Sequence, residues 1–504
     1  MSAEHLDVLI VGAGISGIGA AHHLQDRCPT RSYAIFEARG DIGGTWDLFR
    51  YPGIRSDSDM HTLGYRFRPW TAAKSIADGE AILEYVHDTA REAGIEANIR
   101  LHHRVVAAEW SSERARWTVT AERSDTDEPV TVTCDFLFVC SGYYRYDQGY
   151  LPDFAGIESF GGETVHPQHW PEDLDYAGKR VVVIGSGATA VTLVPAMAAK
   201  AEHVTMLQRS PTYVVSLPGE DPIAKGLRRF LPDRVVYPIV RWKNVMLQLG
   251  SYRLSRRRPE LMKKLIRRGL VNSLPPGYDV DTHFKPKYDP WDQRLCMVPD
   301  SDLFDAIAAE KAAIATGQIE TFTEKGIKLE SGEELEADVV VTATGLNLLF
   351  LGGMRLSVDG TEPDIAKSFT YKGMMLDGIP NFAFTIGYTN ASWTLKADLT
   401  AEFVCRLLNH MEAGRYDRCA PEASDPSLTE EPLLDFTSGY VQRSLDELPK
   451  QGSKEPWKLR QNYPVDLRNL RYGPLEDGAM QFSRSASAPP RSAATEPLAT
   501  SASR

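Results

Sequence analysis

A strand, a glycine-rich turn and a helix follow one another twice in this chain, and this repeated unit constrains the fold more than any other feature. The first copy, "DVLIVGAGISGIGAAHHL", carries Gly12, Gly14 and Gly17 between an apolar run and a helical pattern. In such a unit the first glycine permits the tight turn, the second lets the backbone approach a pyrophosphate, and the third allows close packing of helix on strand. The next strand, "SYAIFE", ends at Glu37, where a carboxylate can accept hydrogen bonds from a ribose. The order of strand, glycines, helix, strand and acid predicts a dinucleotide site rather than a turn that binds nothing.

The second copy, "KRVVVIGSGATAVTLVPAM", has Gly185 and Gly187, with Ala190 at the place of the third glycine. The strand after it ends at Arg209 and Ser210 instead of an acid. A carboxylate at this place would repel a 2′-phosphate, whereas a guanidinium binds one through charge-assisted hydrogen bonds. The first site therefore suits a dinucleotide with a free ribose, and the second suits NADPH.

Two different dinucleotide sites on one chain imply electron transfer between them. The segment "GGTWDLFRYPG", residues 43–53, identifies the first cofactor as FAD, because its glycines let the chain pass close to the flavin side of the nucleotide. Trp46 can cover the cofactor there. We predict the first site from the following residues: Gly12, Gly14, Ile15, Ser16, Gly17, Glu37, Gly44, Thr45, Trp46, Asp57 and Val105. The predicted second site consists of Gly185, Ser186, Gly187, Ala188, Thr189, Ala190, Arg209 and Ser210.

The alternation of strands and helices predicts an α/β fold with two doubly wound, Rossmann-like dinucleotide-binding domains. Two further buried strands, at 134–144 and 337–345, mark the points where the chain leaves and re-enters the FAD domain. The predicted domains are a discontinuous FAD domain (1–150 and 337–482), a linker and NADPH domain (151–336) with a basic helical insertion at about 218–285, and a tail (483–504). The tail is rich in Ser, Ala and Pro and lacks periodicity, so we expect it to be disordered.

Composition narrows the function classes. The net charge of −12 in 504 residues disfavours nucleic acid as a partner. Six scattered cysteines without any C-x-x-C indicate a reduced, cytoplasmic location and argue against the active-site dithiol of a disulfide reductase. The first residues lack a basic leader, and no apolar run is long enough to span a membrane.

Charge is unevenly distributed along the chain. Residues 225–268 contain fourteen Lys and Arg but only two acidic residues, in a helical pattern that interleaves apolar and basic side chains. This segment suits a solvated helical insertion or a positive field that attracts a phosphorylated cofactor; it also suits a pair of helices lying on a membrane surface. The sequence leaves both interpretations open.

The segment "FGGETVHPQHWP", residues 160–171, places two histidines and a tryptophan between the two domains. Its pattern resembles the fingerprint of type I Baeyer–Villiger monooxygenases. The resemblance extends from residue 6 to about 470 and includes "YPGIRSDSDM", "WDQRLC" and "GYTNASWTLKADL". It implies a hinge between the domains, formed by Phe160, Gly162, His166, Trp170 and Pro171. Metal ligation by His166 and His169 is disfavoured because no Cys or acidic partner lies at ligand spacing, so we predict no metal site.

The resemblance also implies an activity. In this family reduced flavin reacts with O2 to a flavin C4a-peroxide, which converts ketones to esters or lactones and oxygenates sulfides and thioamides. The anionic oxygen species requires a fixed cation. Arg294, in "WDQRLC", stands at the position of the family's catalytic arginine, and Asp57 matches the acid that orients it. Many members carry a lysine before that arginine where this chain has Gln293, which puts the NADPH preference in question.

Two alternatives remain at this stage. A flavin monooxygenase limited to nitrogen or sulfur would share both nucleotide motifs, although its linker typically lacks the Trp-Pro pair. A non-catalytic NADPH-binding redox sensor would share them as well. Ester formation from a ketone, with one NADPH consumed per product, separates these possibilities.

Overall fold

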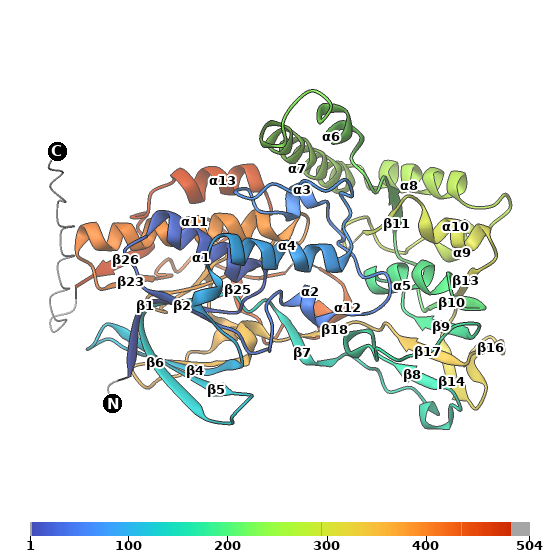
Figure 1. Ribbon diagram of the computed structural model, residues 1–504, viewed down its shortest axis with the longest axis horizontal. Coiled ribbons are helices and arrows are strands. Elements are labelled where there is room, and N and C mark those ends of the chain that lie inside the picture. Colours follow the sequence, from blue (N-terminus) through green and yellow to red (C-terminus); the bar gives the residue numbers. More distant parts are fainter. Residues whose placement is uncertain (1–2, 294, 435, 485–504) are drawn as a thin grey trace, which may run out of the picture.

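The computed structural model of the protein describes residues 3–293, 295–434 and 436–484. Two sheets lie side by side, each flanked by helices, and the first contains the amino-terminal strand (Figure 1). The predicted α/β fold class is confirmed. The first sheet has the order β19-β4-β5-β6-β1-β2-β3, and β22 also pairs with β6. Its strands are β1 (Glu4–Val11), β2 (Tyr33–Phe36), β3 (Ile99–Arg100), β4 (His103–Ser111), β5 (Arg116–Arg123), β6 (Pro129–Val139), β19 (Arg355–Val358) and β22 (Phe382–Phe384).

Helices cover this first sheet and bury its apolar face. The central strand β1 carries a fully buried run, with Val8, Leu9 and Ile10 inaccessible to solvent. The covering helices are α1 (Ile15–Arg27), α4 (Gly79–Glu92), α11 (Trp393–Gly414) and α13 (Tyr463–Tyr472). Helix α11 packs against α1 and is buried along most of its length, which explains its apolar sequence.

Part of the first sheet departs from the parallel arrangement that we predicted. Strands β4, β5 and β6 pair antiparallel, whereas β1, β2, β3 and β22 are parallel to their neighbours. The β4–β5 connection is a tight turn, and β5 alternates between buried and half-buried residues. This alternation is typical of an antiparallel strand with one face on the core. The sheet is therefore mixed.

The second sheet is parallel, with the order β13-β10-β9-β17-β8. It consists of β8 (Glu163–Val165), β9 (Arg180–Ile184), β10 (His203–Gln208), β13 (Ala312–Thr316) and β17 (Val339–Thr342), with helices α5 (Ala188–Ala198) and α10 (Asp302–Ala308) against it. A three-stranded antiparallel sheet of β14 (Ile319–Thr323), β15 (Gly326–Leu329) and β16 (Glu334–Glu336) adjoins it, and β11 (Val214–Leu217) pairs with β12 (Cys296–Pro299).

The chain returns to the first domain later than we predicted. Strand β17 pairs with β9 and β8 and so belongs to the second sheet, although we assigned residues from 337 onward to the FAD domain. Outgoing and returning segments then meet, because β7 (Tyr144–Gly149) and β18 (Leu346–Leu348) form an antiparallel ribbon between the domains. The chain therefore returns to the FAD domain after β17, because β17 is hydrogen-bonded within the second sheet.

The basic insertion contacts both domains, whereas we had assigned it to the NADPH domain. It contains α6 (Pro222–Leu227), α7 (Asp233–Arg257), α8 (Pro259–Ser273) and α9 (Val280–His283). In α7 the hydroxyl of Tyr237 donates to the carbonyl of Tyr65 at 2.9 Å, and Arg241 donates to the carbonyl of Gly64 at 2.7 Å. In α8, Ile266 and Leu270 pack into the core of the second domain. The insertion thus joins the two domains.

The carboxyl terminus of the described chain is ordered one strand further than expected. Strand β26 (Met480–Ser483) pairs with β23 (Arg418–Pro421), so Ser483 belongs to the first domain rather than to the tail. Residues 485–504, which make up nearly all of the predicted tail, lie outside the described residues.

Candidate functional site

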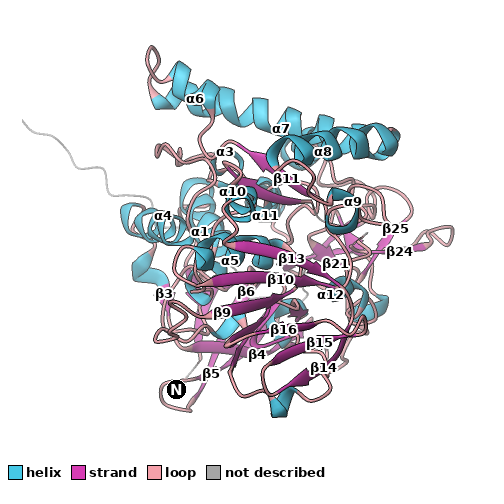
Figure 2. Cartoon of the chain, turned by 90° about the vertical axis from the view of Figure 1, so that its right-hand side faces the viewer, coloured by secondary structure: helices cyan, strands magenta, loops and turns pink. Residues whose placement is uncertain are grey.

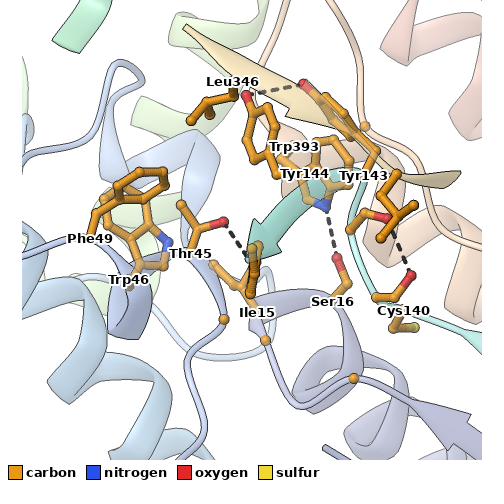
Figure 3. A pocket seen from close by; sticks show the side chains of 18 of the residues that line it. Ile15, Ser16, Thr45, Trp46, Phe49, Cys140, Tyr143, Tyr144, Leu346 and Trp393 are labelled. Atoms are coloured by element: carbon orange, nitrogen blue, oxygen red, sulfur yellow. Dashed lines mark hydrogen bonds between the residues drawn. The ribbon is translucent and has the colours of Figure 1, made fainter. Parts of the chain in front are cut away.

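A cavity of about 810 Å³ opens at the carboxyl end of β1, where the chain turns into α1 (Figure 3). The carboxyl ends of parallel strands are the usual ligand site of such sheets. Most residues of the predicted first site line this cavity, namely Gly12, Gly14, Ile15, Ser16, Glu37, Gly44, Thr45, Trp46, Asp57 and Val105. Ala188 and Thr189 of the predicted second site line it too. One cavity therefore collects residues of both glycine motifs.

The first glycine motif has backbone geometry that side chains would disrupt. Gly12 has a φ of +99°, and a Cβ there would lie 2.7 Å from the carbonyl oxygen of Cys140. Gly17 lies outside the cavity lining, in the contact between helix and strand, where a Cβ would approach the carbonyl oxygen of Gly12 to 1.9 Å. Gly14 faces Gly44 across the mouth of the turn, where a Cβ on Gly14 would lie 3.6 Å from the Cα of Gly44. Together these glycines leave backbone, not side chains, exposed to a ligand.

Helix α1 presents its amino terminus to the cavity. Gly14 is its N-cap, and among the described residues no side chain caps the helix and no acidic residue lies in its first turn. The first N–H groups of a helix need an external acceptor, and the helix dipole favours an anion there. This end of α1 suits the pyrophosphate of a dinucleotide.

Glu37 lies at the end of β2, beside the same turn. One carboxylate oxygen accepts from the N–H of Ala13 at 2.7 Å, and the other accepts from the N–H of Arg39 at 2.9 Å. Burial raises the pKa of Glu37 above its usual range, while these two hydrogen bonds act in the opposite direction. The two bonds fix the orientation of the carboxylate, which retains lone pairs for ribose hydroxyls.

Sequence reasoning missed an aromatic wall on the opposite side of the cavity. Trp393 donates from its indole N–H to the hydroxyl of Ser16 at 2.7 Å and stacks on Tyr143, with 5.2 Å between ring centroids (Figure 3). Tyr146 lies near Thr45, and burial raises its pKa to about 12. Tyr143 lies in the β6–β7 connection, Tyr146 in β7 and Trp393 at the start of α11, so all three are distant in sequence from either glycine motif. The segment "GYTNASWTLKADL" contains Trp393, but the resemblance did not predict that this residue lines the cavity.

Of the two residues predicted to be catalytic, Asp57 and Arg294, only Asp57 lies among the described residues. Asp57 lines the cavity. Arg294 lies outside the described residues. Downstream of it, Met297 in β12 also lines the cavity.

The second glycine motif repeats the helix-terminus geometry at α5. Gly185 has a φ of +137°, and a Cβ there would lie 2.3 Å from the carbonyl oxygen of Ala343. At Gly187, the N-cap of α5, a Cβ would meet no atom of the described chain within 4 Å. No side chain of the described residues caps α5 either. The open space at Gly187 and the uncapped helix suit a second phosphate group.

The predicted 2′-phosphate residues lie beside this motif. The hydroxyl of Ser186 is 2.7 Å from the hydroxyl of Thr212 and donates to the carbonyl of Ser210 at 3.3 Å. Arg209 is exposed and makes no ion pair within the described part of the chain. Gly185, Ser186, Gly187, Ala190, Arg209 and Ser210 do not line the large cavity, in contrast to Ala188 and Thr189.

His166 ties the linker to the returning chain. Its Nδ1 accepts from the N–H of Gln168 at 3.2 Å, and its Nε2 lies 3.3 Å from the carbonyl oxygen of Gly345, to which it donates. Burial lowers the pKa of His166, so the ring is neutral near pH 7. Gln168, which the sequence did not single out, is buried and donates to the carbonyls of Arg145 and Tyr146 at 2.8 Å each. His166 thus holds the linker against the residue that precedes β18, and Gln168 holds it against β7.

The other residues of the fingerprint have packing positions. Phe160 packs near Phe322 of the small antiparallel sheet, with 6.1 Å between ring centroids. A Cβ at Gly162 would lie 2.3 Å from the carbonyl oxygen of Asp338. Trp170, followed by Pro171, packs against the core of the second domain. These contacts fix the linker to the second domain, whereas His166 and Gln168 fix it to the ribbon.

Comparison with known proteins agrees with this geometry. The chain matches the flavin-binding monooxygenase-like family over residues 74–241 and an NAD(P)-binding Rossmann-like domain over residues 10–75. It is 59% identical over 482 residues to the FAD-containing monooxygenase EthA of Mycobacterium tuberculosis H37Rv, covering 95% of this chain and 98% of that protein. The chain belongs to the FAD-containing monooxygenases. The first-site cavity of this monooxygenase, with its glycine turn, uncapped helix and oriented Glu37, fits the FAD that gives the family its name.

Solved structures share the fold of this monooxygenase. A steroid monooxygenase bound to NADP superimposes with a TM-score of 0.75 at 20% identity, covering 95% of this chain and 100% of that one. The open form of cyclohexanone monooxygenase gives a TM-score of 0.73 at 19% identity, with the same coverage. At this identity the likeness concerns the arrangement of the two domains.

Proposed function

We propose that this protein is an NADPH-dependent Baeyer–Villiger monooxygenase, which uses O2 to convert ketones to esters or lactones and also oxygenates sulfides and thioamides. One observation carries the proposal: a single cavity is lined by the FAD motif and by Ala188 and Thr189 at the amino terminus of the second motif's helix. Two dinucleotides bound at these helix ends would meet in that cavity. One structural neighbour, cyclohexanone monooxygenase, is named for a ketone, which supports ketone substrates.

The chain's own residues have distinct parts in this proposal. Bound FAD would supply the redox chemistry and the activation of oxygen. The uncapped end of α1 would hold its pyrophosphate, and Glu37 would accept hydrogen bonds from its ribose. Arg294 provides a cation for the negative charge that develops on oxygen, and Asp57 orients that cation. Trp46, Tyr143 and Trp393 contribute apolar surface that keeps bulk water from the reacting atoms.

The deciding experiment is product analysis. Purified enzyme is incubated with NADPH, O2 and linear, cyclic and aryl ketones, and esters are quantified against NADPH consumed. The proposal requires an ester or lactone with about one NADPH per product. Oxygenation of amines and sulfides without any ester would identify an enzyme limited to nitrogen and sulfur, and NADPH binding without oxygenation of any substrate would identify a redox sensor.

Arg209→Ala should raise the KM for NADPH about tenfold and leave the KM for NADH nearly unchanged. The loss of one or two charge-assisted hydrogen bonds to the 2′-phosphate accounts for this size of effect. Steady-state kinetics with both cofactors measure it. Lys200→Ala, an exposed residue on the same domain outside the motif, is the matched control. Equal effects on the two cofactors would show that Arg209 does not read the phosphate.

His166→Ala should retain FAD but lower kcat by roughly threefold to tenfold, as expected when one hydrogen bond of a moving linker is lost. The substitution removes the bond to Gly345 without touching the FAD site. Stopped-flow and steady-state rates report the effect, and flavin absorbance reports FAD content. His169→Ala, an exposed histidine three residues away, is the control and should behave as wild type. A wild-type kcat in His166→Ala would contradict the hinge assignment.

A further inference from the structure

Helix α7 presents an apolar stripe to solvent. Val235, Ile239, Trp242 and Met246 follow each other at intervals of three or four residues, so they share one side of the helix. Their exposed fractions are 38%, 47%, 43% and 54%. The buried side of α7, which includes Tyr237 and faces the protein, is opposite. A surface helix normally keeps its outward side polar, so this stripe needs another explanation.

The stripe continues onto neighbouring elements. Phe230, in the α6–α7 turn, is 86% exposed, and Leu261 and Leu265 of α8 are 47% and 50% exposed. We call the whole set the apolar face: Ile223, Phe230, Leu231, Val235, Ile239, Trp242, Met246, Leu247, Leu261 and Leu265. Helices α6, α7 and α8 lie along one outer edge of the molecule in both views (Figures 1 and 2). Large exposed apolar side chains gathered on neighbouring elements of one outer edge are typical of an interaction site.

Cations surround the apolar face. Arg253 lies eighteen positions after Val235, which is five helical turns, and therefore extends the same side of α7. In α8, Lys264 and Arg268 alternate with Leu261 and Leu265. Seven cations of the insertion make no ion pair with any described residue: Arg229, Arg234, Arg253, Arg257, Arg258, Lys264 and Arg268. A protein of net charge −12 thus carries a local positive surface interleaved with large apolar side chains.

We propose that the apolar face docks this enzyme onto an anionic lipid bilayer, with α7 lying in the plane of the interface. Trp, Phe and Leu beside Arg and Lys form the side-chain set by which interfacial helices bind membranes, with apolar groups entering the acyl boundary and cations meeting lipid phosphates. Within the described residues, no helix combines the length and apolarity needed to cross a bilayer, which agrees with a helix that lies on the surface.

Charge decides between a bilayer and a second copy of this chain. A symmetric dimer would place the same patch on both subunits, so the unpaired cations of one would face those of the other. No described carboxylate neutralises them within the patch. An anionic lipid surface offers negative charge over the whole face, and lipid is therefore the better complement.

The face is rigidly connected to the FAD domain. Besides Tyr237, the buried Arg241 donates to carbonyls of the segment that follows the Asp57 loop, including that of His61 at 2.8 Å. Asn244 donates to Asp59 at 2.8 Å. Docking through α7 would hence fix the orientation of the whole enzyme toward the membrane. This inference does not depend on the proposed oxygenation chemistry.

Co-sedimentation with vesicles tests the proposal on the FAD-loaded enzyme. Vesicles of phosphatidylcholine with about one third phosphatidylglycerol are compared with pure phosphatidylcholine, at about 0.02 M and about 0.5 M NaCl. We expect at least about tenfold more bound protein on the anionic vesicles at low salt, and release at high salt, because the attraction is screened. Equal binding to both vesicle types, or none at any salt concentration, would overturn the proposal.

Two variants separate the apolar and ionic contributions. Ile239→Asp with Met246→Asp removes apolar insertion, and Arg253→Glu with Arg257→Glu reverses two cations; each pair should lower binding at low salt at least tenfold. Lys200→Glu with Lys311→Glu makes the same charge change on exposed residues of the second domain and should leave binding unchanged. Flavin absorbance verifies that each variant is folded. If instead sedimentation velocity shows a wild-type dimer that Ile239→Asp with Met246→Asp dissociates, while vesicle binding persists, the face is a self-association surface and the lipid assignment is wrong.

Discussion

Arg294→Ala is expected to lower ester formation from ketones about a hundredfold or more, the usual loss when one stabiliser of a developing negative charge is removed. Flavin reduction places no such demand on a cation, so NADPH should still bleach the flavin. Electrons should then leave as hydrogen peroxide instead of product. Stopped-flow absorbance, a peroxide assay and product analysis measure the three quantities.

Structural support for this prediction comes from Asp57 and from the chain that follows Arg294. Asp57 and Met297 both line the cavity, so the chain on the carboxyl side of Arg294 reaches the site at which FAD is placed. Arg294→Lys keeps a positive charge but loses the planar fork, so its effect should be intermediate. Arg460→Ala removes an exposed arginine paired with Glu455 and should be without effect. Ester formation at a near wild-type rate in Arg294→Ala would show that another group supplies the cation.

Local rules explain why the two nucleotide motifs could be predicted. A glycine turn between a buried strand and a helix is specified within a dozen residues, and the structure gives Gly12 and Gly185 the positive φ values that only glycine adopts easily. The order of elements was sufficient for the fold class as well. The same local reasoning placed Glu37 at the end of the strand that follows the first glycine turn.

Features that depend on contacts between residues far apart in the sequence could not be predicted from such local patterns. Strand β17 is a buried apolar run, and its residues alone do not indicate with which of the two sheets it pairs. Trp393 reaches Ser16 across 377 positions of sequence. The contacts of Arg241 with the FAD domain were hidden for a related reason: in a segment rich in arginine, no local signal separates a buried arginine from its exposed neighbours.

Sequence and structure together also explain the mixed first sheet. The alternating pattern "RWTVTAER" of β5 is typical of an antiparallel strand, but no helix follows it, so the alternation of strands and helices did not predict it. An antiparallel excursion needs only a tight turn, so it can be inserted into a doubly wound fold without disturbing the parallel strands that carry the glycine motifs. The glycine turn between β1 and α1 was predictable because that excursion lies apart from it.

Gly17→Ala is expected to weaken FAD binding by about 10- to 100-fold and to lower the thermal stability of the enzyme. A methyl group there would lie 1.9 Å from the carbonyl oxygen of Gly12, so α1 must move away from β1. Overpacking of this kind costs about 1–3 kcal/mol. If this strain is present in the FAD-bound enzyme, it accounts for the expected 10- to 100-fold loss of FAD affinity. Flavin fluorescence on dilution gives the dissociation constant, and thermal unfolding gives the stability.

Gly187→Ala is the matched control, because its methyl group meets no described atom within 4 Å. It should leave FAD affinity and stability unchanged, and raise the KM for NADPH if the second dinucleotide approaches that turn closely. The comparison separates two roles. Gly17 leaves room for packing of the protein on itself, whereas Gly187 leaves room for a ligand. If Gly17→Ala binds FAD as tightly as wild type, close packing of α1 on β1 does not hold the first site. If Gly187→Ala leaves the KM for NADPH unchanged, the second motif does not bind the reductant.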